Sequence, residues 1–149
     1  MSEPRFKIRV ADIEDKTSIY ELLVESVENA NLTREEQARQ YRVLDKNITR
    51  SIKDKLTTVI ISKEVIIGVS VASITSIMAT LMYFVIKEEY RYTKASILLM
   101  HNTAYKQLVG KDIYVKDIKY GSRKILDELV KDKLYRVNKD KIKQVSRLV

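Results

Sequence analysis

The side chains that could transfer protons are few, and most of them lie between residues 83 and 120. Glu88 and Glu89 are neighbouring carboxylates that could take a proton from an amine. Neighbours at the end of a strand face opposite sides, so we expect a solvated turn here and keep only Glu89 as a weak catalytic candidate. The region also holds tyrosines that could line a cleft or pack at a sheet edge: Tyr83, Tyr90, Tyr92, Tyr105, Tyr114 and Tyr120.

The composition excludes several other kinds of chemistry. The chain has no cysteine, so it can form neither a disulfide nor a thiolate metal site, and it has no cysteine nucleophile. His101 is the only histidine, which excludes a site with several imidazole ligands. We therefore expect no bound metal, and we expect His101 to be a structural residue on a helix. Three glycines are too few for a glycine-rich phosphate loop.

The positive charge is concentrated in the C-terminal third of the chain. Residues 106–149 contain 13 basic and 6 acidic side chains, a net charge of +7, whereas residues 1–105 have a net charge of +1. Such an asymmetry predicts an anionic partner for 106–149, such as a polyanion, a membrane surface or an acidic protein. The alternative is a lysine-rich surface that only contacts solvent.

Hydrophobic periodicity predicts the strands and helices that hold these residues. Alternating or β-branched runs predict strands at 6–10, 57–62, 65–74, 77–86 and 113–118. Apolar residues at helical spacing predict helices from 15 or 17 to 27, from 33 to 52, from 93 to 108 and from 122 to 130. Residues 134–149 fit either two short strands or a helical tail. We expect residues 1–149 to form one α/β domain.

One segment also fits a membrane-spanning helix. Residues 65–86 are 22 consecutive uncharged residues, which is long enough to cross a bilayer. Gly68 and the Thr75–Ser76 pair interrupt this run where a hairpin would need them, and its Val, Ile, Ser and Thr content favours strands. We therefore expect two strands here and no membrane span. The N-terminal residues contain no apolar core of the signal-peptide kind, so the chain is not expected to be secreted.

The order of predicted elements resembles that of the GNAT N-acetyltransferases. Three stretches carry the resemblance. Residues 83–99 (YFVIKEEYRYTKASILL) are similar to the family's fourth strand and third helix, where "V-x-P-x-Y-R" leads into an R/Q-x-x-G-x-G/A loop. Ile66-Ile67-Gly68-Val69 is similar to the third strand, and residues 126–137 to the "Y-E-K-L-G-F" junction that follows the fourth helix. The resemblance implies a single GNAT-like domain with a mixed, mostly antiparallel central sheet flanked by helices.

The same resemblance implies where acetyl-CoA would bind. In the family, backbone N–H groups at the start of the third helix hold the pyrophosphate, and an N–H of the fourth strand polarises the acetyl carbonyl. The corresponding residues here are Val85 on the strand, Arg91 at the R/Q position, and the helix start at Thr93, Lys94, Ala95 and Ser96.

Three departures from the family pattern predict a loss of acetyl transfer. Lys94 and Ser96 replace the two small loop residues, and we expect their side chains to block the phosphates. Gly121-Ser122 replaces an Asn region, and Val130 replaces the Tyr that protonates the leaving thiolate. Tyr114 and Tyr120 are the remaining weak candidates for that acid. On this basis we expect no cofactor, with acetyl-CoA as the cofactor only if the site is active.

Three functions are therefore compatible with the sequence. The first is a GNAT-fold protein without transferase activity that acts as a binding or structural subunit with protein partners, in the cytoplasm or within a virion, for example of a bacteriophage. The second is an active N-acetyltransferase with a divergent acetyl-CoA loop. The third is a small membrane-anchored protein that spans the bilayer at 65–86. The first two differ in whether the chain binds acetyl-CoA.

Overall fold

The computed structural model describes residues 5–28, 32–75, 78–90, 94–103 and 112–115. Its elements in chain order are β1 (Phe6–Val10), the 3₁₀ turn η1 (Ile13–Asp15), α1 (Lys16–Glu28), α2 (Arg34–Lys53), β2 (Thr57–Ser62), β3 (Val65–Thr75), β4 (Met78–Ile86), the 3₁₀ turn η2 (Glu88–Tyr90), α3 (Lys94–Asn102) and β5 (Asp112–Val115). The order is the one predicted. The helix expected from 122 and the elements expected after 134 lie outside the described residues.

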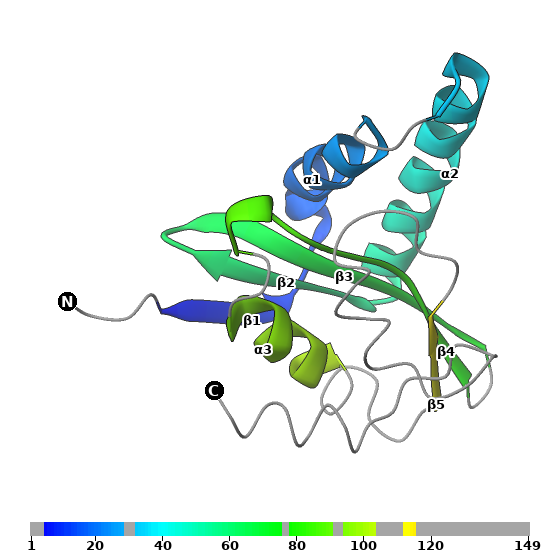
Figure 1. The fold of residues 1–149 in the computed structure, drawn as a ribbon. Helices are drawn as coiled ribbons and strands as arrows, with labels where there is room; N and C mark the ends of the chain where they lie inside the picture. The colour runs from blue at the N-terminus through cyan, green and yellow to red at the C-terminus, as the bar shows by residue number, and fades with distance from the viewer. Residues whose placement is uncertain (1–4, 29–31, 76–77, 91–93, 104–111, 116–149) are drawn as a thin grey trace.

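The five strands form one sheet in the order β1-β2-β3-β4-β5. Neighbouring strands are antiparallel except β4 and β5, which are parallel. Helices α1 and α2 cover one face of the sheet and α3 covers the other (Figure 1). The fold is therefore the predicted α/β layer arrangement, with a mixed, mostly antiparallel sheet.

Each face of the sheet has its own hydrophobic core. The α3-side core contains the fully buried Leu81, Phe84 and Leu99, and the core on the other side contains Ile19, Leu44 and Ile48 from α1 and α2. The strands alternate between the two cores, so they are apolar on both faces. This explains why residues 65–75 and 78–86 contain no charge: they are β3 and β4, two strands that pack against both cores. Among the described residues, no helix combines the length and the apolar character that a membrane crossing requires.

Helix α2 begins at the cap that the sequence predicts, whereas Asp12 caps the turn before α1, and not a residue at 15 or 17, where the sequence placed the start of that helix. Thr33 accepts a hydrogen bond from the Glu36 N–H and starts α2. At the other end, the Leu56 N–H donates to the Ser51 carbonyl and the Lys55 N–H donates to the Ile52 carbonyl. These two bonds form a Schellman motif in which Lys55 takes a φ of 59°. The motif reverses the chain directly from α2 into β2.

Two features fix the register of the β2–β3 hairpin. Lys63 and Glu64 both have positive φ, as a two-residue type I′ turn requires. A Cβ on Gly68 would lie 2.4 Å from Ile86 Cδ1 and 2.9 Å from Ile60 Cγ2, so only glycine lets these strands pack as they do. The predicted tight turn at 63–64 and the glycine inside β3 are thereby both explained.

An ion pair joins β1 to the start of α1. Arg9 Nη1 and Nη2 donate to the two Asp15 carboxylate oxygens at 2.6 and 2.8 Å, and Asp15 also accepts from the Asp12 N–H. The Asp15 side chain is 11% exposed and the Arg9 side chain 45%. The Arg9 hydrogen bonds lower the pKa of Asp15 below its ordinary value.

We expect Asp15→Asn to destabilise the fold at neutral pH by about 1–2 kcal/mol, a range reduced because Arg9 is partly solvated. A carboxylate whose folded-state pKa is depressed contributes stability above its unfolded pKa and loses it as the pH falls through the folded pKa. The difference in the free energy of unfolding between wild type and Asp15→Asn should therefore be largest at pH 7 and shrink below about pH 4. Urea denaturation at pH 7 and pH 2.5 measures it, with the exposed Glu14→Gln as control. A difference as large at pH 2.5 as at pH 7 would show that the ion pair is not its cause.

Candidate functional site

A β-bulge interrupts the pairing of β3 with β4. Val71 is opposite Tyr83 and Ala72 is opposite Leu81, so Met82 has no partner in the register. As a result two consecutive side chains, Met82 and Tyr83, pack on the α1/α2 side, whereas Leu81 and Phe84 belong to the α3-side core. An extra residue of this kind bends the strand and redirects its remaining residues.

The bulge follows directly on the part of β4 that pairs with the described residues of β5. The parallel register there runs from Met78 opposite Asp112 to Leu81 opposite Val115. A strand that is bulged at such a point has backbone N–H and C=O groups outside the β3–β4 ladder, and an extended ligand can bind groups of this kind.

Tyr83 lies directly after the bulged residue and is held from α2. Asn47 Nδ2 donates to the Tyr83 hydroxyl oxygen at 3.1 Å. Burial raises the pKa of the Tyr83 phenol, and the Asn47 hydrogen bond opposes this in part. The hydroxyl is therefore protonated at neutral pH.

The start of α3 follows β4 through η2. Lys94 is the first residue of this helix and is exposed, whereas Ala95 and Ser96 are fully buried. The first turn of a helix has a positive electrostatic potential that favours phosphate groups. This end of α3 therefore combines the helix dipole with one exposed ammonium group.

The structure corrects one expectation about this turn. The sequence suggested that the Ser96 side chain would stand in the path of a ligand's phosphates. Instead it points into the α3–sheet interface, where its hydroxyl is buried and has no hydrogen-bond partner. The physical reason is the helical period, because Ser96, Leu99, Met100 and Thr103 form the buried stripe of α3.

Similar proteins were sought by sequence and by structure. The sequence matches no protein-family model and no curated protein. Among solved structures, the PaiA N-acetyltransferase from Thermoplasma acidophilum in complex with coenzyme A superposes with a TM-score of 0.66 at 18% identity, over 89% of this chain and 96% of that one. This chain has the GNAT fold.

Other solved GNAT-fold structures agree. A GNAT-family acetyltransferase from Bacillus cereus gives a TM-score of 0.57 at 12% identity, over 74% of this chain and 70% of that one. Ard1 from Thermoplasma volcanium gives a TM-score of 0.53 at 19% identity, also over 74% of this chain and 70% of that one. The fold predicted from the element order is confirmed.

Most of the predicted site residues lie within the part of the chain that the structure describes. The structure describes Val85, Lys94, Ala95 and Ser96, and it places the Val85 side chain in the α1/α2-side core, so only its backbone can contact a ligand. Tyr114 lies on β5 in register with Thr80. Arg91, Thr93 and Tyr120 lie outside the described residues. The roles assigned to these residues remain predictions.

The remaining sequence candidates lie away from the β4 bulge. Glu88 and Glu89 are exposed on η2, as expected for a solvated turn, and with Glu25 and Lys87 they line a shallow depression of about 430 Å³. His101 is half-buried on α3. No cluster of three or more His, Asp or Glu side chains suited to a metal ion occurs within the described ranges.

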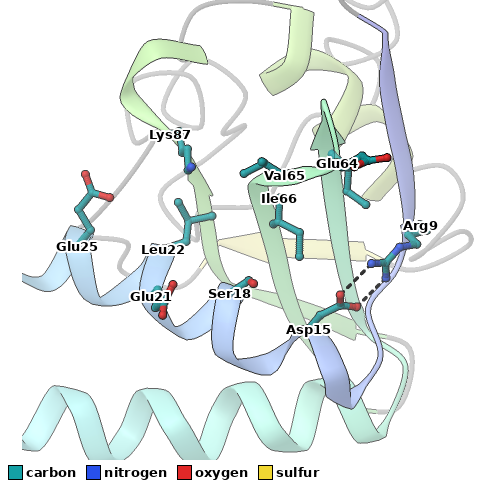
Figure 2. Close-up of a pocket in the computed structure, with 11 residues that line it drawn as sticks. Arg9, Asp15, Ser18, Glu21, Leu22, Glu25, Glu64, Val65, Ile66 and Lys87 are labelled. Carbon is teal, nitrogen blue, oxygen red and sulfur yellow. Dashed lines mark hydrogen bonds and ion pairs between the residues drawn. The ribbon is translucent and has the colours of Figure 1, made fainter.

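A larger cavity lies between α1 and the β2–β3 hairpin (Figure 2). It has a volume of about 490 Å³, and the Arg9–Asp15 ion pair closes one end. Its other charged lining residues are Glu21, Glu25, Glu64 and Lys87. The sequence did not indicate this cavity, because its acidic residues come from a helix and a turn that are distant in the chain.

Proposed function

We propose that this GNAT-fold chain binds acetyl-CoA along β4 at its bulge and transfers the acetyl group to an amine. One observation carries the proposal: the bulge at Met82 interrupts the β3–β4 ladder directly after the residues of β4 that pair with β5. A bulge bends its strand and leaves backbone groups of the extra residue out of the ladder, which would provide room for a ligand and donors to hold it.

The described residues fit the chemical parts of acetyl-CoA. Its phosphates match the first turn of α3, where the Ala95 and Ser96 side chains are turned into the core and Lys94 adds a positive charge. The exposed carboxylates of Glu88 and Glu89 repel a phosphate nearby. Phosphate binding therefore requires that the attraction from the first turn of α3 exceed this repulsion. The extended arm of the molecule matches the backbone groups that the bulge at Met82 leaves out of the β3–β4 ladder.

Bound acetyl-CoA would supply a thioester carbonyl. Attack by an amine would form the amide, break the C–S bond and release coenzyme A as the thiol, which takes up the proton that the amine loses. The part of this chain would be to orient the carbonyl and to donate backbone hydrogen bonds from β4 to its oxygen, where negative charge develops in the transition state. Fixed backbone donors cost no reorganisation when the charge develops.

Titration calorimetry with acetyl-CoA tests the proposal. We expect saturable binding with one molecule per chain and a weaker response to adenosine diphosphate, which reaches the helix start but not the bulge in β4. Release of free thiol in the presence of small primary amines would then report transfer. A chain that binds neither acetyl-CoA nor coenzyme A would refute the proposal.

A second candidate function is a GNAT-fold binding subunit without transferase activity, for example in a virus particle. The observation in its favour is that Val130 and Gly121-Ser122 replace residues that active members use. The net charge of +7 over 106–149 would then serve an anionic partner in the assembly. No binding of acetyl-CoA, or binding with no thiol release for any amine tested, would favour this function.

A further inference from the structure

We propose that α2 positions the bulge in β4, and that Asn47 and Ser51 are the residues through which it does so. The proposal deepens the proposed function, because the bulge is where acetyl-CoA would bind. Asn47 and Ser51 lie four positions apart on α2 and therefore share one face of the helix. Each of them bonds a different one of the two strands that meet at Met82.

The contact to β4 is the bond from Asn47 to Tyr83. It is 3.1 Å long and joins side chains 36 positions apart in the chain. Tyr83 is the first residue after Met82 that is again in register with β3. Because the register gives Met82 no partner, the side-chain bond supplies a constraint at this point that the ladder lacks.

The contact to β3 is made by Ser51, which is buried at the end of α2. Its hydroxyl donates to the Ala72 carbonyl at 2.8 Å and accepts from the Thr57 hydroxyl at 2.7 Å. The Ala72 N–H donates to the Leu56 carbonyl at 3.2 Å. Ala72 is the register partner of Leu81, the last residue before the bulge.

The two contacts lie on opposite sides of Met82, and together they fix Met82 as the residue that the register leaves without a partner. A bulge can move along a ladder when the strands shift register by one residue, and such a shift turns side chains to the other face. Moving the bulge past Tyr83 would carry its hydroxyl away from Asn47, while Ser51 and Leu56 keep Ala72 in place. Helix α2, which covers this face of the sheet (Figure 1), thereby sets the position of the bulge in β4.

The test uses Asn47→Ala, the nearly isosteric Tyr83→Phe, and the double variant. In the absence of ligand, amide hydrogen exchange at 82–84 should be faster in both single variants, with exchange in β2 unchanged. The dissociation constant for acetyl-CoA should rise about three- to ten-fold in each. The double variant should be no weaker than the single variants, because either substitution already removes the bond. Lys46→Ala, an exposed neighbour on α2, should change neither measurement.

Each outcome separates this proposal from the proposed function. Lower global stability with unchanged relative exchange at 82–84 would show that Asn47 and Tyr83 only hold the fold together, and would overturn the positioning role. Additive effects of the two substitutions on exchange would also overturn it. Faster exchange at 82–84 in a protein whose wild type does not bind acetyl-CoA would support the positioning role and refute the proposed function.

Discussion

Deleting Met82 should weaken acetyl-CoA binding by about 100-fold or more while leaving the chain folded. With Met82 removed, Leu81 and Tyr83 become neighbours opposite Ala72 and Val71, which are also neighbours. The β3–β4 ladder then becomes regular. The deletion is expected to fold because every other side chain of β4 keeps its face of the sheet.

The loss of binding follows from the straightened strand. Without the bulge, the β3–β4 ladder uses the backbone groups at this point, and the strand loses the bend that would make room for the ligand. Calorimetry with acetyl-CoA measures the loss, and circular dichroism with urea denaturation verifies the fold. Met82→Ala is the matched control, since it keeps the extra residue and should bind as the wild type does. A folded deletion variant with wild-type affinity would show that the bulge is not part of the site.

The second large effect is expected at Lys94. We expect Lys94→Glu to weaken acetyl-CoA binding about 10- to 50-fold at low salt, because it places a negative charge at the start of α3, where the phosphates would lie. The effect should shrink as salt is added, since the position is exposed. Calorimetry at two salt concentrations provides the measurement.

The variant Lys94→Gly separates charge from bulk. The sequence suggested that the Lys94 and Ser96 side chains block the phosphates, which predicts tighter binding by glycine variants. The exposed position of Lys94 and the burial of Ser96 predict the opposite sign for Lys94→Gly, a loss of a few-fold. Tighter binding by Lys94→Gly would restore the steric account. Ser96→Gly is expected to lower stability rather than raise affinity, because it removes a buried side chain from the helix.

Local patterns predicted most of the fold. The strand at 6–10 follows from alternation, α2 from its Thr33 cap and apolar stripe, and the hairpin from the turn at 63–64. These features depend on residues close in sequence. The orientation of Ser96 was also available, since its spacing to Leu99 and Met100 places it on the buried stripe of α3.

The central feature of the site could not be predicted in this way. The bulge at Met82 is a mismatch between two strands, and nothing in the residues 81–83 alone distinguishes an extra residue from a paired one. The bonds from Asn47 to Tyr83 and from Ser51 to Ala72 join a helix to strands that are distant in the chain. Their presence depends on how the layers pack.

The most direct test of the central claim is an acetyl-CoA titration of the isotope-labelled protein, followed by amide chemical shifts. The account predicts saturable shifts in β4 at residues 82–86 and in the first turn of α3, with no such shifts in the Met82 deletion variant. Shifts confined to the cavity between α1 and the β2–β3 hairpin, or no shifts at saturating acetyl-CoA, would contradict it.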